Sequence, residues 1–168
     1  GGIGKRVSHA NAILIGKNLA LTCSHCFSKK LIQKIIVAKQ PAYILASEYP
    51  SALLQVSEPS GMMPVKVSTR PACEGDELLH RYYDHNQKRE TSRIVHWHDH
   101  NYALEGNSPG MSGSGYYDKT GNIVAVVEET TGYAANQITI LGFLEKFGYF
   151  LWTQQEQDEF NALQFGLR

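Results

Sequence analysis

Disulfide-forming cysteine, net charge and long apolar runs are scarce or missing in this sequence. There are three cysteines, Cys23, Cys26 and Cys73, so they cannot all pair, and no disulfide framework is expected. Such a set is typical of a reducing compartment. Sixteen basic residues balance sixteen acidic ones, which argues against nucleic acid or an anionic membrane as the main partner.

Segments that cross or target membranes are also missing. No run reaches the roughly 18 apolar residues of a membrane span, and no basic stretch followed by an apolar one suggests a signal peptide. We therefore expect an intracellular protein. The 168 residues show no internal repeat or low-complexity segment and are enough for one domain with a real core.

Short apolar runs separated by turn residues fill most of the chain, which indicates an all-β protein of the barrel or sandwich type. Near the C-terminus, apolar residues at helical spacing from Phe143 to Leu151 predict a helix instead. The expected strands are 12–15, 19–22, 35–38, 43–46, 52–56, 65–68, 77–83, 93–97, 102–104, 115–117, 123–127 and 137–141.

A glycine-rich loop at 107–115, NSPGMSGSG, holds the first candidate for chemistry. In Gly110-Met111-Ser112-Gly113 the glycines permit the positive φ angles of a tight loop and the close approach of a substrate. Such a loop presents the Ser112 hydroxyl beside backbone N–H groups. Ser114 is the rival serine, but it lacks this pattern.

A histidine at the end of an apolar run supplies the second candidate. The run 19–26, LALTCSHC, delivers His25 to the end of a strand. Serine is a poor nucleophile unless a hydrogen-bonded imidazole takes its proton. His25 and Ser112 are therefore the pair that nucleophilic catalysis needs.

These two segments together resemble the histidine and serine motifs of chymotrypsin-like serine proteases, in the compact form found in positive-strand RNA viruses and some bacteria. The resemblance spans roughly residues 8–153. It implies an all-β fold of two antiparallel six-stranded barrels with a C-terminal helix, in one protease unit of 1–168. The first barrel would span about 1–70 and carry His25, and the second about 71–142 and carry Ser112. Residues 143–168 would form the helix and an extension.

The resemblance also implies roles for single residues. Ser112 would be the nucleophile and His25 the general base. The N–H groups of Gly110 and Ser112 would form the oxyanion hole. Strict register puts Pro50 where the family carries its acid, so Glu48, two residues earlier, is the expected acid. The alternatives are a Ser–His dyad or an acid from elsewhere, such as Asp76 or Asp99.

The substrate would lie against the loop before Ser112 and the strand after it. Gly106 would stand at the base of the pocket for the residue before the cut. Glu128, Glu129 and Thr130 would line the pocket wall and pair with an extended substrate. The carboxylates of Glu105, Glu128 and Glu129 would favour a basic residue near the cut, with only one of Glu128 and Glu129 facing the cleft.

Two clusters have metal-ligand character. Cys23-Ser24-His25-Cys26 has the donors of half a zinc site, but no second Cys/His pair stands at finger-like spacing. His96, His98 and His100 would share one face of a strand and could bind zinc or read an acidic side chain. We favour a polar strand or loop that leads to the serine, and nothing elsewhere demands a metal, so no metal site is expected.

The sequence therefore predicts a serine endopeptidase without a cofactor, acting on polypeptide through an acyl-enzyme on Ser112. Its short loops favour processing of a viral polyprotein, its own precursor included, in the host cytoplasm, while a bacterial or phage origin stays open. The alternatives are a protease fold that only grips a peptide and a zinc-binding protein. The oligomeric state is left open.

Overall fold

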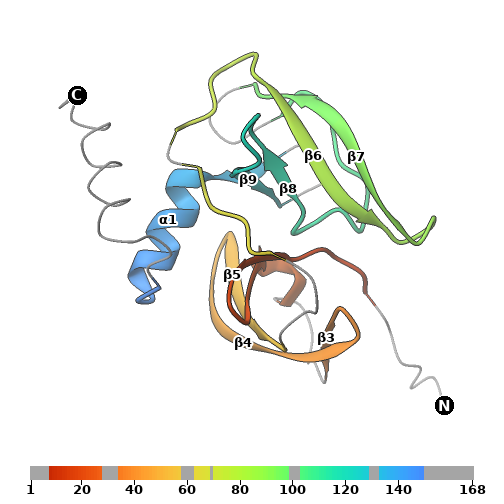
Figure 1. The fold of residues 1–168 in the computed structure, drawn as a ribbon, viewed down its shortest axis with the longest axis vertical. Coiled ribbons are helices and arrows are strands. Elements are labelled where there is room, and N and C mark those ends of the chain that lie inside the picture. The colour runs from red at the N-terminus through yellow and green to blue at the C-terminus, as the bar shows by residue number, and fades with distance from the viewer. Residues whose placement is uncertain are drawn as a thin grey trace.

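The structure, a computed structural model, describes residues 8–27, 34–57, 63–68, 70–98, 103–128 and 133–149. Its strands form two antiparallel sheets, drawn in red to orange and in green to teal in Figure 1, with one helix beside them. Each sheet has five strands within the described residues. The expectation of an all-β fold with a C-terminal helix is confirmed, and six strands per sheet are not seen.

The first sheet carries the N-terminal third of the chain. The predicted hairpin forms at Lys17-Asn18, where Asn18 takes a φ of 59°, a conformation that asparagine tolerates better than most residues. A short 3-10 helix, η1 (Ser24–Phe27), directly follows the strand β2 (Leu19–Cys23). The sheet order is β1-β2-β5-β4-β3, formed by β1 (Ile13–Gly16), β2 (Leu19–Cys23), β3 (Ile35–Val37), β4 (Gln40–Glu48) and β5 (Ser51–Val56).

The second sheet is built around a long hairpin and a buried central strand. Its hairpin strands pair over their full length, from Glu77 with His96 to Asp84 with Arg89. Every residue of β9 (Ile123–Val127) is buried; it is the second strand after the glycine-rich loop at 107–115, called the serine loop below. The sheet order is β10-β9-β8-β6-β7, formed by β6 (Glu77–Asp84), β7 (Arg89–His96), β8 (Gly115–Tyr117), β9 (Ile123–Val127) and β10 (Ala134–Asn136).

Two expected strands are reduced to isolated bridges. The segment 65–68 contributes the pair Val67–Ile123, and the segment 102–104 contributes Trp97–Ala103, with Tyr102 outside the described residues. Both bridges lie on the second sheet's side, because Ile123 is in the second sheet and Trp97 directly follows the segment 89–96 of that sheet.

The predicted strand at 137–141 is wrong, because these residues form the start of α1 (Gln137–Lys146). The Asn136 side chain accepts a hydrogen bond from the Thr139 N–H at 3.0 Å, which caps the helix at its first turn. Gly148, with a φ of +81°, follows the helix end. The helix therefore begins before the apolar pattern at 143–151 suggested, and Phe150 and Leu151 lie outside the described residues.

One apolar core joins the two sheets and the helix. Leu21 and Leu53 enter it from the first sheet, Ile123 from the second, and Ile140 and Leu144 from α1. All five side chains are almost wholly buried. Burial of this kind stabilises by roughly 25 cal/mol per Å² of apolar surface, so the sheets are packed against each other rather than merely linked. The described residues contain no helix long and apolar enough to cross a membrane.

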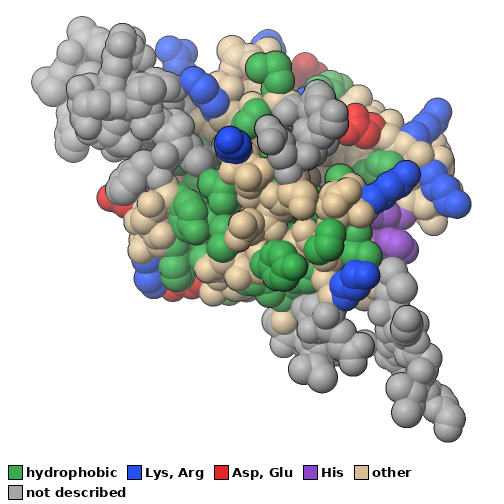
Figure 2. Space-filling view, turned by 60° about the horizontal axis from the view of Figure 1, so that its bottom comes forward, with side chains coloured by type: hydrophobic (Ala, Val, Ile, Leu, Met, Phe, Trp, Pro, Cys, Tyr) green, Lys and Arg blue, Asp and Glu red, His purple; other side chains and the backbone are tan. Residues whose placement is uncertain are grey.

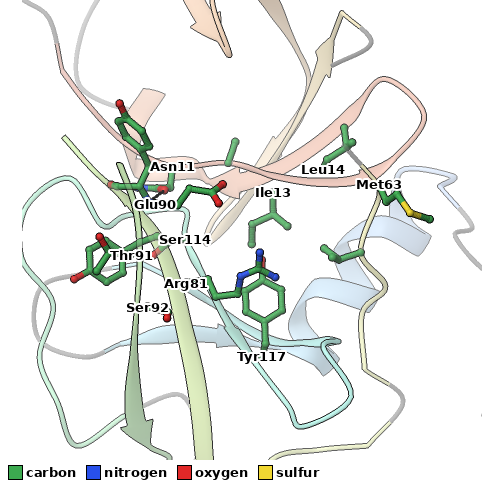
Figure 3. A pocket seen from close by; sticks show the side chains of 14 residues that line it. Asn11, Ile13, Leu14, Met63, Arg81, Glu90, Thr91, Ser92, Ser114 and Tyr117 are labelled. Atoms are coloured by element: carbon green, nitrogen blue, oxygen red, sulfur yellow. Dashed lines mark hydrogen bonds between the residues drawn. The ribbon is translucent and has the colours of Figure 1, made fainter. Parts of the chain in front are cut away.

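A pocket of about 430 Å³ lies between the two sheets (Figure 3). Ile13 and Leu14 approach it from β1, and Arg81 and Tyr117 from the second sheet, with the guanidinium 5.3 Å from the tyrosine ring centroid. Neither Ser112 nor His25 lines this pocket.

Hydrophobic side chains also gather on the face turned forward in Figure 2. The exposed hydrophobic side chains on β3 and β4 are Ile36, Tyr43, Ile44 and Leu45.

Candidate active site

β2 and η1 position His25. Four of the five residues of β2 are buried, so the strand is fixed in the core up to its last residue. The Ser24 N–H then donates to the Pro50 carbonyl at 3.0 Å, which ties η1 to the turn between β4 and β5. His25 is thus held by a rigid strand on one side and an anchored turn on the other.

The serine loop is shaped by two glycines in the left-handed region. Gly110 has a φ of +93° and Gly113 a φ of +85°, which side chains with a Cβ rarely adopt. The Gly113 N–H donates to the Val127 carbonyl at 2.9 Å, so the loop is bonded to the end of β9. Ser112 sits between the two glycines, at the turn of the loop.

Asn11 clamps the same loop from the first sheet's side. Its N–H donates to the Ser112 carbonyl at 2.7 Å, and its side-chain amide donates to the Gly110 carbonyl at 2.8 Å. Its side-chain oxygen accepts from the Tyr83 N–H at 2.7 Å. Asn11 was missed in the sequence, because an asparagine before a strand has no motif that marks it. It is a positioning residue for both glycine-loop carbonyls.

Gly113 also lies where the serine loop packs tightly against Thr22 of β2 and against Asn11. A Cβ built there would collide with the Asn11 carbonyl oxygen and the Thr22 hydroxyl. The Thr22 hydroxyl itself donates to the Asn11 carbonyl at 2.7 Å. Only glycine lets the two segments come this close, and that closeness brings Ser112 to His25.

The structure brings Ser112, His25 and Glu128 together in a chain of contacts. Ser112 Oγ lies 3.3 Å from His25 Nε2, and His25 Nδ1 lies 3.1 Å from Glu128 Oε1. Since a carboxylate can only accept, Nδ1 carries the ring proton and Nε2 is left to accept from the serine. The Glu128 side chain is 1% exposed and that of His25 is 39% exposed.

The serine hydroxyl has a second acceptor. Ser112 Oγ is also 3.3 Å from the main-chain oxygen of Glu128. Both distances are long for an O–H donor, as is common for catalytic hydrogen bonds before a substrate is bound. Ser112 Oγ is therefore within reach of His25 Nε2, at a distance longer than that of an optimal hydrogen bond.

The expected acid, Glu48, lies elsewhere. It ends β4, is 46% exposed on its side chain, and binds Lys146 Nζ of α1 at 2.6 Å. The carboxylate on His25 is Glu128, which the sequence suggested only as a pocket-wall residue. The reason is topological: Glu128 follows β9, and the Val127–Gly113 hydrogen bond brings the end of that strand to the serine loop. Asp76, another alternative, accepts from the Cys73 N–H at 2.8 Å, and Asp99 lies outside the described residues.

A second serine–histidine pair lies deeper in the second sheet. Ser114 Oγ is 2.7 Å from His80 Nε2, and both side chains are buried. Arg93 Nε donates to His80 Nδ1 at 3.1 Å. Burial, helped by the Arg93 charge, lowers the pKa of His80 to about 3, so the ring is neutral near pH 7.

This second pair cannot activate its serine. An arginine only donates, so His80 Nδ1 accepts and the ring proton sits on Nε2, where it donates to Ser114. The Ser114 hydroxyl proton goes to the Met111 carbonyl at 2.5 Å. The geometry thus separates the two serines: Ser112 faces a histidine nitrogen that can accept a proton, and Ser114 faces one that cannot.

Two of the carboxylates expected to attract a basic substrate residue already hold histidines. Glu105 accepts from the His96 N–H at 2.9 Å and lies 2.9 Å from His96 Nδ1, while Glu128 is on His25. At Gly106, the carbonyl accepts from the Arg93 guanidinium at 2.7 Å. Glu129 and Thr130 lie outside the described residues. Charges of both signs therefore lie near Gly106: the Arg93 guanidinium on its carbonyl and the Glu105 carboxylate, which is paired with His96.

The histidines at 96 and 98 lie beside different glutamates. Hydrogen bonding to Glu105 raises the pKa of His96, and His98 lies 4.0 Å from Glu74. His100 is outside the described residues. Across those residues, a compact group of three metal-ligand side chains occurs only at Cys23, His25 and Cys26.

No protein-family model and no curated protein matches this chain. Solved structures do match. The Rv3671c protease of M. tuberculosis, in its active form, has a TM-score of 0.66 and 16% identity over 84% of this chain and 74% of that one. A serine endoprotease from Yersinia pestis has a TM-score of 0.69 and 18% identity over 82% and 57%.

The HtrA-type protease AlgW, solved with a decapeptide, has a TM-score of 0.69 and 16% identity over 82% of this chain and 51% of that one. This chain thus spans little more than half of the Yersinia and AlgW chains. At these identities the similarity establishes the fold alone: this chain has the chymotrypsin-like fold of serine proteases.

Proposed function

We propose that the protein is a serine endopeptidase in which Ser112 attacks the peptide bond. The observation that carries the proposal is the chain of contacts from Ser112 Oγ through both nitrogens of His25 to Glu128. His25 Nε2 takes the serine proton as the acyl-enzyme forms and gives it to the leaving amine. A water molecule then attacks the acyl-enzyme while His25 takes its proton. That proton returns to Ser112 Oγ as the N-terminal fragment leaves.

Glu128 is the orienting acid in this proposal. Its carboxylate fixes the proton on His25 Nδ1 and stabilises the imidazolium that forms when the serine is deprotonated. Glu128 follows a strand that comes after the nucleophile in the sequence. Register with the resembled family would instead place the acid between the histidine and the serine, near Pro50. Near-complete burial strengthens this interaction, because little water screens it.

The oxyanion hole is assigned to the N–H groups of Gly110 and Ser112. Within the described residues neither N–H is used in a hydrogen bond. The clamp by Asn11 holds the Gly110 and Ser112 carbonyls, which keeps the loop from turning these donors away. Preorganised donors of this kind typically contribute about 3 to 4 kcal/mol to the transition state.

The substrate is proposed to be an extended polypeptide that pairs along residues 128–130, with the side chain before the cut near Gly106. Because Arg93 binds the Gly106 carbonyl while the adjacent Glu105 carboxylate is already paired with His96, we expect a neutral or acidic residue there and not a basic one. Matched peptides with glutamate or lysine before the cut would test this. Faster hydrolysis of the lysine peptide would contradict it.

Processing of a viral polyprotein inside a host cell is the finer form of the proposal, and it rests on the resemblance of the two motifs. The chain, embedded between flanking segments of its own precursor, should release itself when His25 and Ser112 are intact. A precursor that stays uncut, while the isolated chain cleaves peptides, would reject self-processing and keep the endopeptidase.

Labelling with a fluorophosphonate tests the proposal directly. We expect one adduct per chain on Ser112, found by intact mass and peptide mapping. It should be lost in Ser112→Ala and in His25→Ala. Folded protein that takes no label would refute an activated serine and favour a fold that only grips a peptide.

A further inference from the structure

Two cysteines lie directly behind the candidate base. Cys23 ends β2 and is buried, Cys26 lies in η1 and is half-buried, and their Sγ atoms are 3.2 Å apart. Both are free thiols. Their sulfurs and a ring nitrogen of His25 all lie within 4.8 Å of one another.

This donor set suits zinc. Two thiolates and an imidazole are common ligands of tetrahedral Zn²⁺, and soft thiolates favour zinc over the hard cations. With Zn–S bonds of ~2.3 Å, tetrahedral geometry holds the two sulfurs roughly 3.8 Å apart. The observed 3.2 Å is within a small side-chain rotation of that separation.

A fourth donor is close by. Glu128 Oε1 lies 3.1 Å from His25 Nδ1, with its side chain almost wholly buried. Either this carboxylate or a water can complete the tetrahedron. The ion has a route in, because the His25 side chain is 39% exposed and Cys26 is half-buried.

We propose that Cys23, His25 and Cys26 form a zinc site, and that zinc bound there switches Ser112 off. A neutral imidazole has one lone pair and one N–H. If the metal takes the lone pair at either nitrogen, the other nitrogen carries the proton, and nothing remains to accept the proton of Ser112. The inhibitory half of this proposal rests on the proposed protease function, while the binding half does not.

Cobalt tests the binding half. Metal-free, reduced protein is titrated with Co²⁺ and then with Zn²⁺. We expect one Co²⁺ per chain with thiolate-to-cobalt charge-transfer absorption in the near ultraviolet, which Zn²⁺ then abolishes. Ser112→Ala should behave identically, because its hydroxyl is not a ligand. The absorption should vanish in Cys26→Ser and persist in Cys73→Ser, whose thiol is exposed and outside the cluster.

Fluorophosphonate labelling tests the inhibitory half. One equivalent of Zn²⁺ should slow labelling of the wild type at least tenfold, and a chelator should restore it. Labelling of Cys26→Ser should be insensitive to zinc, with its fold checked by circular dichroism. Cys23→Ala replaces it if the serine variant does not fold.

Three results would overturn the proposal: no thiolate-to-cobalt absorption, Zn²⁺ inhibition that is equal in wild type and Cys26→Ser, or full labelling with zinc bound. Metal-free wild type that does not label at all would instead reject the protease function. The cobalt spectrum would still decide the metal site on its own.

Discussion

Glu128→Gln keeps the size of the side chain at His25 Nδ1 and removes its charge. A neutral amide can donate to that nitrogen, which favours the ring tautomer with its proton on the serine's side. The imidazolium also loses its counter-charge. We expect the rate of fluorophosphonate labelling at Ser112 to fall on the order of 10³- to 10⁴-fold, as when the acid of a Ser-His-Asp triad is neutralised.

Glu48→Gln is the matched control for Glu128→Gln. It removes an exposed carboxylate whose partner is Lys146, and exposed ion pairs contribute about 0 to 1 kcal/mol. Labelling should stay close to wild type. The reverse order of effects, with Glu48→Gln the slower variant, would return the acid's role to Glu48 and remove Glu128.

His80 makes the stability of the protein depend on pH. Its pKa is about 3 in the folded protein, against 6.5 as the ordinary value, so between these values the unfolded chain binds the extra proton and stability falls as pH falls. Its neighbours are Arg93, Ser114, Tyr82 and Tyr116. From about pH 7.5 to about pH 5, we expect this one group to lower the free energy of unfolding by about 2 kcal/mol.

Urea unfolding of wild type and His80→Gln at the two pH values isolates this contribution. Glutamine does not titrate, and every other titrating group is present in both proteins. The wild type should lose more stability than the variant over the interval. Parallel losses in the two proteins would show that folding does not lower the pKa of His80.

Ser112 and His25 could be found in the sequence, because each stands in a local motif of glycines or apolar residues. Asn11 could not, and neither could the contact of Glu128 with His25, since the sequence suggested Glu128 only as a pocket-wall residue. Asn11 acts through contacts with residues 72 and 99 positions away, and Glu128 meets His25 across 103 positions. Such pairings depend on how the sheets pack, and nothing in the neighbouring sequence encodes them.

At the scale of elements, β2 and the serine loop depend on one glycine. Gly113→Ala would force a Cβ into the Asn11 carbonyl and the Thr22 hydroxyl, neither of which is the flexible end of a long side chain. Gly121→Ala has the same φ, +84° against +85°, but no atom within 4 Å of the added Cβ. Both variants carry backbone strain of about 1 kcal/mol, and only the first also separates Ser112 from His25.

Thermal unfolding and labelling of the two alanine variants check this. We expect Gly113→Ala to be destabilised by at least about 2 kcal/mol more than Gly121→Ala, in the range of overpacked sites, and to label slowly. Equal stability and equal labelling would mean that the two segments can part without cost.

For the elements, as for the residues, features set by the local sequence were predicted and features set by the packing of the sheets were not. Strands were predicted where turn residues and alternation are local, as at the hairpin around Asn18. The segment 137–141 has alternating apolar residues and was expected as a strand, yet it is helical. Its cap at Asn136 and the burial of Ile140 and Leu144 in the shared core decide the conformation, and that core exists only after the sheets have met.

At the scale of the whole molecule, the core shared by both sheets and α1 predicts that they unfold together. Leu21 is fully buried in that core, so Leu21→Ala in the first sheet should cost about 2 to 5 kcal/mol.

Trp97 belongs to the separate core of the second sheet and reports on the unfolding of that sheet by its fluorescence. In a Trp152→Phe background, which leaves Trp97 as the single tryptophan, Leu21→Ala should shift the Trp97 transition and the circular dichroism transition equally. Ile36→Ala, at a side chain 57% exposed on β3, should shift neither by more than about 0.5 kcal/mol. A Trp97 transition that stays in place while circular dichroism shifts would show two independently folding halves, and His25 and Ser112 would then be held together by an interface that can open.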